Sequence, residues 1–194
     1  MAGRPKHYSQ NELIDRAMEA FWLKGYSATS AQDLMKAMKI GQGSFYLNFK
    51  GGKKELYQKS LLRFSETRIK KFDKSIKASE NPLLLIKQLF TDLANSTTDI
   101  KENGCYLGNA LVELSNHDND TKNLSADLLL HFKQVFEEGL LISKKKGLLK
   151  TSQSPQILAS HLLNLWNGIS VTLRIPHDKK EIKQVIEMNL QCLL

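Results

Sequence analysis

The most distinctive side-chain chemistry of the chain lies in residues 41–49, which read Gly-Gln-Gly-Ser-Phe-Tyr-Leu-Asn-Phe. In a helix, which turns by about 100° per residue, Phe45 and Phe49 share one face and would anchor the segment in a core. Such a helix is about 12 Å long, close to the width of the major groove of B-DNA. The remaining side chains lie at its start, on its outward face or on its flanks: Gln42, Gly43, Ser44, Tyr46, Leu47 and Asn48.

These outward residues suit the recognition of double-stranded DNA. An amide such as Gln42 can hydrogen-bond the edge of adenine, and Leu47 can contact the methyl group of thymine. Gly43 permits a close approach of the backbone. Hydroxyl and amide groups that can bind phosphates or bases are present in Ser44, Tyr46 and Asn48. The alternative is that Tyr46 and Leu47 are half-exposed packing residues.

Two capping boxes and a glycine turn place this segment third in a set of short helices. Ser9 is followed by Glu12, and Ser30 by Asp33, at the spacing in which the two side chains cap a helix start reciprocally. Gly41 interrupts the second helix just before residues 42–49. Three helices within the first 50 residues, with a tight turn before the third, are typical of a helix-turn-helix motif.

The rest of the chain also follows the helical period. Apolar residues recur at helical spacing in residues 53–75, 82–100, 104–116, 121–146 and 155–175 and in a final helix after residue 178. We expect about nine helices and no strand, hence an all-α fold. The expected organisation is a helix-turn-helix domain with a basic N-terminal arm at residues 1–52, a connecting helix at 53–75, and a second helical domain at 76–194.

Charge is unevenly distributed along the 194 residues. Lys and Arg number 28 and Asp and Glu 20, which leaves a net charge of +8. Residues 1–60 hold ten basic and five acidic side chains, whereas the remaining residues hold 18 and 15. Basic charge concentrated in a short segment is typical of a protein that binds a polyanion, although a solvated lysine-rich surface gives the same count.

Composition disfavours several other classes of protein. Cys105 and Cys192 are too few for a disulfide-stapled scaffold or a four-cysteine zinc site, and no His/Cys pair has the spacing of metal ligands. No nucleophile elbow, phosphate loop or pair of catalytic carboxylates is apparent, so we expect no enzyme, no cofactor and no metal. Neither an apolar run of about 18 residues nor a charged-then-apolar leader occurs, so we expect a cytoplasmic protein outside the membrane.

A further set of residues in the first domain has the spacing that is found in a known protein family. Its members are Ala20-Phe21, Lys24-Gly25-Tyr26, Ala28-Thr29-Ser30, Asp33-Leu34, Ile40, Gly43-Ser44-Phe45-Tyr46 and Asn48-Phe49. At this spacing, over roughly residues 8–62, the chain resembles the N-terminal DNA-binding domain of the TetR family of bacterial transcriptional regulators. One departure is that three residues, rather than the usual two, separate Phe49 from the helix-opening Lys53.

The resemblance implies a role for individual positions of the first domain. Positions that face DNA bases in the family are held here by Gln32, Gln42, Gly43, Ser44 and Leu47. Positions that commonly contact phosphate are held by Ser30, Tyr46, Asn48 and Lys53. Ser30 is also a helix N-cap, so either role or both remain open for its hydroxyl. The extra residue after Phe49 leaves open whether Lys53 or Lys54 takes the usual phosphate contact.

The basic residues ahead of the first helix could extend the contact with DNA. Arg4 and Lys6 lie in the segment Gly-Arg-Pro-Lys, which is similar to minor-groove hook peptides. An extended basic arm before a helix-turn-helix can enter the adjacent minor groove, where narrow A·T-rich tracts attract arginine. The alternative is a basic tail that adds only nonspecific attraction.

The resemblance also implies that residues 76–194 bind an effector and form a homodimer. The last two long helices would form a four-helix bundle with a second copy, and part of their apolar line must instead serve the core of one chain. Dimer candidates are Leu158, Leu162, Leu165, Ile169, Leu173, Ile182, Val185, Ile186 and Leu190. Pocket candidates are Phe64, Phe90, Cys105, Tyr106, Asn109, His131, Phe132, Phe136, His161 and Trp166. For the aromatic residues and the two histidines among these, ordinary core packing is the alternative.

Cys105 lies in the segment Gly-Cys-Tyr-Leu-Gly-Asn, which is similar to a subgroup of the family that senses electrophiles through a cysteine. A thiol in the first turn of a helix lies near the positive end of the helix dipole, which lowers its pKa. The alternative is a small buried hydrophobic residue, which a free cysteine usually is. Cys192 is expected to be a packing residue.

Taken together, the residues favour a DNA-binding protein, and the resemblance implies a dimeric repressor that binds a palindromic operator in double-stranded DNA and is released by a small-molecule or electrophile effector. The alternative is an architectural or protein-responsive DNA-binding factor without a small-molecule effector. A closed apolar pocket in the second domain would favour the repressor, and a filled core would favour the alternative.

Overall fold

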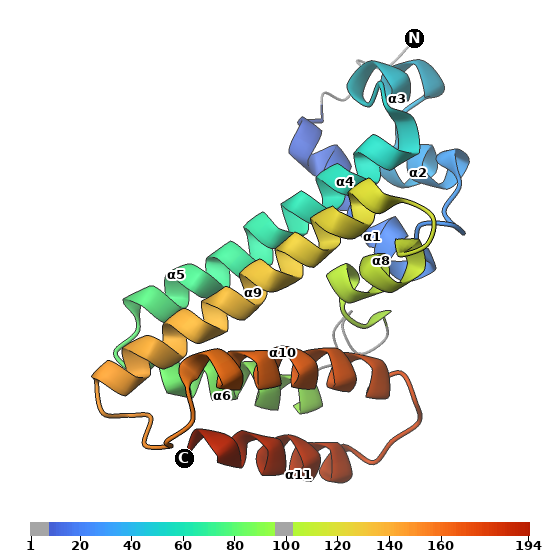
Figure 1. Ribbon diagram of the computed structural model, residues 1–194. Coiled ribbons are helices and arrows are strands. Elements are labelled where there is room, and N and C mark those ends of the chain that lie inside the picture. The colour runs from blue at the N-terminus through green and yellow to red at the C-terminus, as the bar shows by residue number, and fades with distance from the viewer. Residues whose placement is uncertain (1–7, 96–102) are drawn as a thin grey trace. The chain divides into compact units, whose positions relative to one another are not determined.

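The computed structural model describes residues 8–95 and 103–194 and is helical, without a strand, over those ranges (Figure 1). The chain divides into two compact units, Met1–Glu66 and Thr67–Leu194. The boundary between the units therefore falls inside the segment 53–75 that the sequence predicts as a connecting helix.

The first unit holds four helices, α1 (Gln10–Lys24), α2 (Ala31–Met38), α3 (Gln42–Asn48) and α4 (Gly52–Phe64). Both capping boxes predicted from the sequence are present, because Ser9 and Ser30 each cap the helix that follows. Helix α1 packs against α2 and α4. The core between the helices is apolar and aromatic, and its most deeply buried members are Ala17, Phe21, Leu34, Met38, Phe45, Phe49, Leu56, Tyr57 and Leu61.

The turn between α2 and α3 departs from the sequence-based expectation. Gly41 has an ordinary extended backbone, with φ −84° and ψ 169°, and is the N-cap of α3. The left-handed residue of the turn is Lys39, with φ 58° and ψ 43°, which ends α2. A non-glycine residue in this conformation meets steric resistance between its Cβ and the following carbonyl oxygen, so the strain in the turn lies at the lysine.

The segment predicted as one long helix at 53–75 is interrupted by a π-helical turn. Helix α4 ends at Phe64, the π-helical turn covers Ser65–Ile69, and α5 covers Lys70–Ala78. A π-helical turn contains an extra residue per turn, and the apolar pattern alone does not distinguish it from a regular helix.

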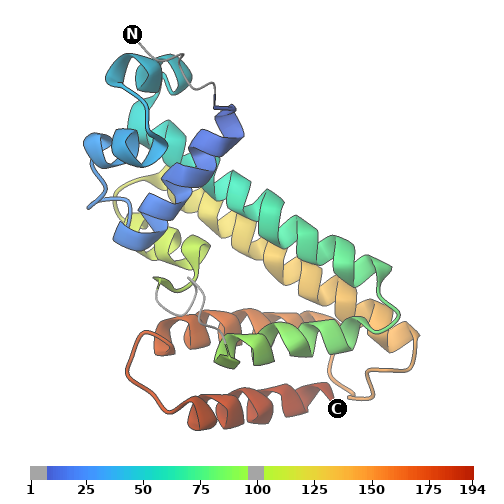
Figure 2. The same cartoon turned by 180° about the vertical axis from the view of Figure 1, so that it is seen from behind.

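The second unit is built around the 27-residue helix α9 (Asn119–Lys145), which packs against α5, α6, α8 and α10. These neighbours are α6 (Pro82–Asn95), α8 (Tyr106–Leu114) and α10 (Pro155–Thr172), together with α5. The last helix, α11 (Lys179–Leu190), packs on α6 and continues into a short 3₁₀ turn, Gln191–Leu193. Figure 2 shows α5 running alongside α9, and α6, α10 and α11 lying together.

In the middle of the second unit, helices α5 and α6 approach α9 closely. A Cβ atom on the buried Gly139 of α9 would lie 3.0 Å from Cδ1 of Ile86 and 3.1 Å from Cγ2 of Ile76. A larger residue at this position would require the side chains of Ile86 and Ile76 to shift by a few tenths of an ångström, and packed interiors have little spare room. None of the described helices is long and apolar enough to cross a membrane.

Candidate DNA-reading helix and effector unit

Helix α3 has one buried and one exposed face, as its sequence predicts. Phe45 and Phe49 are fully buried, with their ring centroids 5.9 Å apart. Leu47 is 77% exposed and Tyr46 49% exposed. Gln42, Gly43 and Ser44 are also exposed, whereas Asn48 is half-buried. A leucine with most of its surface in water on a seven-residue helix contributes little to the stability of the unit.

The first turn of α3 leaves room for an external partner. Apart from Gly43 itself, its chain neighbours and the backbone of its own helix, no described heavy atom lies within 4 Å of the place that a Cβ atom of Gly43 would occupy. The protein's own packing therefore does not require a glycine there. A partner that approaches the backbone closely would supply such a requirement.

Asn48 is partly engaged by the protein itself. Its side-chain Nδ2 donates to the carbonyl oxygen of Ser44 at 2.8 Å, and its own carbonyl oxygen accepts from Nε2 of Gln10 at 3.5 Å. Both contacts fasten the C-terminal end of α3. A phosphate contact by Asn48 would have to share or replace the first of these bonds.

The structure assigns Ser30 to helix capping. Its hydroxyl donates to Oδ2 of Asp33 at 2.7 Å and accepts from the backbone N–H of Asp33 at 3.1 Å. Lys24 Nζ lies 2.7 Å from Oδ1 of the same carboxylate. Hydrogen bonds from Lys24 and Ser30 lower the pKa of Asp33 far below its ordinary value. The single hydroxyl proton of Ser30 is thus used at the start of α2, while Gln32, two residues later, is exposed.

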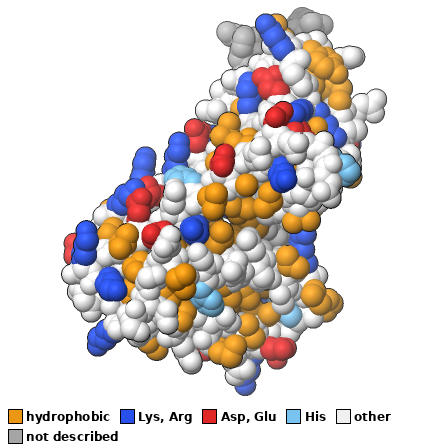
Figure 3. Space-filling model, in the orientation of Figure 1, with side chains coloured by type: hydrophobic (Ala, Val, Ile, Leu, Met, Phe, Trp, Pro, Cys, Tyr) orange, Lys and Arg blue, Asp and Glu red, His pale blue; other side chains and the backbone are white. Residues whose placement is uncertain are grey.

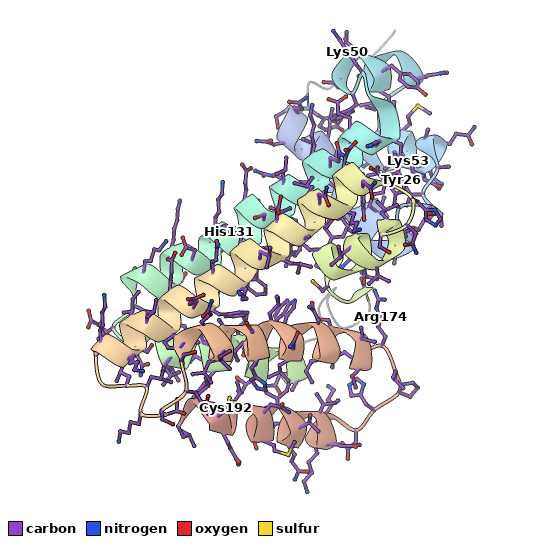
Figure 4. All side chains as sticks on the ribbon, in the orientation of Figure 1. Tyr26, Lys50, Lys53, His131, Arg174 and Cys192 are labelled. Carbon is purple, nitrogen blue, oxygen red and sulfur yellow. The ribbon has the colours of Figure 1, made fainter. Side chains whose placement is uncertain are left out.

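Lys53 is held at the start of α4 by an aromatic contact. Its Nζ lies 4.3 Å from the centre of the Tyr26 ring and 3.5 Å from the carbonyl oxygen of Ser27 (Figure 4). A cation over the face of a tyrosine is attracted by the ring quadrupole, which limits the directions in which Lys53 can point.

Two exposed cations beside α3 have no assigned role in the sequence-based prediction. Lys39 ends α2 and Lys50 follows α3, so they flank the helix on both sides in the chain. Their place next to residues 42–49 is the sequence signal that could have identified them. On the face drawn in Figure 3, basic side chains are interspersed with acidic ones, so charge alone does not mark this end of the molecule. Arg4 and Lys6 lie outside the described residues.

The candidate pocket residues are distributed over both units. Phe64 belongs to the first unit, where its ring packs edge-on against Trp22 at 5.4 Å. In the second unit the structure brings four aromatic rings together, and their centroids lie 4.5–6.2 Å apart: Phe90, Phe132, Phe136 and Trp166. Tyr106 is buried, and Asn109 Nδ2 donates to the carbonyl oxygen of Asn103 at 2.7 Å.

The two histidines among the candidates lie in different places. His161 Nε2 is 3.2 Å from the carbonyl oxygen of Asn189, so this ring bridges α10 and α11. His131 is half-buried on α9 (Figure 4). The bridging contact supports a structural role for His161. Among the described residues no group of three or more His, Cys, Asp or Glu side chains could hold a metal ion.

Cys105 caps a helix, and its pKa moves in the direction opposite to the sequence-based prediction. Its sulfur accepts a hydrogen bond from the backbone N–H of Gly108 at 3.3 Å, which makes it the N-cap of α8. Burial raises the pKa of the Cys105 thiol, and the smaller lowering by the Gly108 N–H and the Trp166 indole does not offset it. The expected lowering of the pKa is therefore wrong, because the sulfur is desolvated as well as near the helix start.

Most of the candidate dimer residues are used inside one chain. Seven of them are buried within the second unit: Leu158, Leu162, Ile169, Leu173, Ile182, Ile186 and Leu190. They pack α10 and α11 against the rest of that unit, so they cannot also face a second copy. Leu165 and Val185 are half-buried. The exposed apolar side chains of these helices and the turn between them are instead Ile157, Val171, Ile175 and Met188, at 58–63% exposure.

The comparisons with known proteins agree with this geometry. The family model for bacterial regulatory proteins of the tetR family matches residues 13–59. The transcriptional repressor DhaR of Mycobacterium sp. (strain GP1) is 22% identical over 187 residues, which cover 95% of this chain and 92% of DhaR. The repressor ComR of Escherichia coli (strain K12) is 24% identical over 191 residues, which cover 97% of this chain and 90% of ComR.

Solved structures show the same fold over nearly the whole chain. The reduced form of NemR from E. coli has a TM-score of 0.83 at 16% identity and covers 95% of this chain and 97% of NemR. A cysteine mutant of the regulator CifR, bound to a 26-base-pair operator, has a TM-score of 0.74 at 20% identity and covers 99% of this chain and all of that one. Fold and helix α3 define a DNA-binding transcriptional regulator of the helix-turn-helix class. Residues 13–59 match the tetR family of bacterial regulatory proteins, and the whole chain is similar in fold to solved regulators of that family.

Proposed function

We propose that the chain is a homodimeric repressor that inserts α3 of each protomer into successive major grooves of a palindromic operator. The observation that carries this proposal is the 77% exposure of Leu47 on a helix otherwise anchored by two fully buried phenylalanines. Gln42, Gly43 and Ser44 are exposed as well, and Lys53, whose Nζ lies 4.3 Å from the centre of the Tyr26 ring, would contact a phosphate. In a symmetric dimer the two half-sites would be about 34–36 Å apart.

The exposed apolar residues of the last two helices supply the dimer surface in this proposal. Ile157 and Val171 lie on one face of α10, since 14 residues are close to four helical turns, and Met188 is exposed on α11. Leu165 and Val185 are half-buried at the edge of this surface. A face of this kind in each of two copies gives the self-complementary contact of a twofold dimer.

The dimer surface has a matched test within the second unit. Val171→Arg places a charge in the proposed interface, so we expect light scattering to report monomers at concentrations where the parent protein is dimeric. Val112→Arg on α8 is the control, because Val112 is 78% exposed and lies outside this surface. Dissociation by both substitutions, or by neither, would contradict the assignment.

In this proposal the effector is a small molecule that binds the second unit. The protein acts in the cytoplasm and does not convert the effector chemically. The effector can release the operator only to the extent that it prefers the conformation in which the two α3 helices are misplaced. Support for the regulatory reading comes from the relatives, which are named as transcriptional repressors rather than enzymes.

The decisive experiment is selection of binding sites from a random pool of double-stranded DNA at about 150 mM salt, which suppresses nonspecific binding. A recovered palindrome with half-sites one helical turn apart is the expected result. Recovery of only A·T-rich DNA without symmetry would refute the dimeric reader and favour an architectural DNA-binding factor, with Arg4 as its main contact.

A further inference from the structure

The carbonyl group that ends α2 is held by a side chain of α1. Nη1 of Arg16 donates to the carbonyl oxygen of Met38, the last residue of α2, at 3.2 Å. The last carbonyls of a helix have no partner within that helix, so a side chain that binds one of them fixes the direction in which the helix ends. Arg16 is half-buried, and its bond is therefore partly shielded from water.

The bonded carbonyl belongs to the peptide group that enters the left-handed residue of the turn. The orientation of this peptide plane relative to the next one follows from the φ and ψ angles of Lys39, 58° and 43°. Across the same turn, the N–H of Ile40 donates to the carbonyl oxygen of Met35 at 3.1 Å. Arg16 adds a contact from another helix to this local bond. The peptide plane between Met38 and Lys39 is therefore tied to the position of α1.

The first turn of α3 depends on this connection for its placement. The N-cap of α3 is Gly41, three residues after Met38, and a glycine has no side chain with which to cap a helix. The buried anchors of α3, Phe45 and Phe49, both follow the first turn. The exposed residues at Gln42–Ser44 lie ahead of these anchors, so the turn that leads into them sets their direction. A shift of the turn would move them relative to a base pair.

An aromatic ring holds the guanidinium of Arg16 in place. Its Cζ lies 4.0 Å from the centre of the ring of Tyr8, the residue before the N-cap of α1. A planar guanidinium that stacks on an aromatic face keeps the N–H groups at its edge available for hydrogen bonds. The ring therefore limits the orientation of the guanidinium while Nη1 donates to the Met38 carbonyl.

A second arginine contact of α1 has a different target. Nε and Nη2 of Arg63, on α4, donate to the two carboxylate oxygens of Asp15 at 2.8 and 3.0 Å. This pair of bonds joins α1 to α4 rather than to the turn before α3. Arg63 is half-buried like Arg16, and the two contacts involve adjacent residues of α1. Arg63 therefore serves as a matched control for the loss of an arginine contact on α1.

We propose that Arg16 is a positioning residue for DNA recognition. Its bond to the Met38 carbonyl, supported by the Tyr8 ring, orients the first turn of α3 so that the exposed residues there meet the bases, and Arg16 itself does not bind DNA. This inference rests on the proposed reading of bases by α3. Its consequence is that loss of the Arg16 contact weakens binding to the operator and leaves the attraction to an unrelated duplex unchanged.

Substitution of Arg16 tests the proposal on the full chain. Arg16→Met keeps an unbranched side chain and removes the hydrogen bond to Met38. We expect it to lower the ratio of operator affinity to scrambled-duplex affinity at least about tenfold, with an unchanged slope of log K against log salt on the scrambled duplex. The control, Arg63→Met, should lower the melting temperature by a similar amount and leave the affinity ratio unchanged.

Substitution of Tyr8 tests the same connection without a change of charge. Tyr8→Leu should lower the affinity ratio about threefold in the parent protein and have no further effect in Arg16→Met, because the ring acts through the arginine. Tyr8→Phe keeps the ring and should leave the ratio unchanged. In the free protein, hydrogen exchange of the Ile40 amide should be faster in Arg16→Met and unchanged in Arg63→Met, because only the first substitution removes a support of the turn.

Five results would overturn the inference. Two concern affinity: an unchanged ratio in Arg16→Met, or an equal loss in Arg63→Met. Two concern mechanism: a shallower salt slope on the scrambled duplex, which would make Arg16 a direct phosphate contact, or additive losses when Tyr8→Leu is combined with Arg16→Met. The fifth is unchanged exchange of the Ile40 amide. Equal affinity of the parent protein for operator and scrambled DNA would instead refute the reading of bases by α3.

Discussion

Replacement of Leu47 by alanine should reduce the affinity for operator DNA and leave the stability of the fold nearly unchanged. Leu→Ala removes three carbon atoms, each worth about 0.8 kcal/mol when transferred from water to an apolar contact. Because 77% of the side chain is exposed in the free protein, most of this energy is available to a base contact, about 2 kcal/mol for each half-site. This corresponds to roughly a 30-fold loss of affinity for each half-site, and on the order of a thousandfold for a symmetric dimer.

The assay is titration of the selected operator and of a scrambled duplex at the same salt concentration. We expect Leu47→Ala to weaken binding to the operator and to leave the scrambled duplex nearly unaffected, so that base preference relaxes. The free energy of unfolding should change by less than about 0.5 kcal/mol, as for other exposed sites. Leu23→Ala on α1 is the control, because Leu23 is 67% exposed in the same unit. An equal loss on both duplexes, or the same loss in the control, would refute the reasoning.

Three further predictions concern charge and titration. Lys53→Ala should weaken operator and scrambled DNA by similar factors and reduce the slope of log K against log salt by about 1 per protomer, and an unchanged slope would remove Lys53 from the phosphate contacts. The pKa of Glu12 is lowered by hydrogen bonds from Ser9, that of Asp33 by Lys24 and then Ser30, and that of Glu55 by Lys59 and then the Gly51 N–H. The stabilisation by these carboxylates is therefore complete above the ordinary carboxyl pKa and is lost as the pH falls through the lowered folded values. Acid titration followed by circular dichroism should therefore show loss of stability below about pH 4, less steeply in Asp33→Asn. Because burial raises the pKa of Cys105, iodoacetamide should modify it slowly at pH 7 in Cys192→Ser and faster only when the pH rises above the ordinary thiol range, and rapid modification at pH 7 would contradict the burial.

Local sequence rules predicted the elements of the first unit because the deciding interactions are local. Ser9 and Ser30 reach groups only three residues away, so the spacing to Glu12 and Asp33 was enough to locate two helix starts. Likewise, helical spacing alone separated the buried Phe45 from the exposed face of α3.

The features that the sequence did not predict depend on contacts between distant segments. The division of the apolar residues of α10 and α11 between core and surface required knowledge of the helices on which they pack, since Leu162 and Val171 are equally apolar and only the first is buried. The direction of the pKa shift of Cys105 required its burial, which no local pattern reports.

The turn before α3 illustrates how stability and charge can oppose each other at one residue. Glycine would adopt the left-handed conformation of Lys39 without steric resistance, so Lys39→Gly would relieve strain worth about 1 kcal/mol, partly offset by the greater backbone entropy of glycine in the unfolded chain. The same substitution would delete one of the cations that flank the DNA-reading helix. Folding alone therefore favours glycine at this turn, whereas the positive charge beside α3 is present only with lysine.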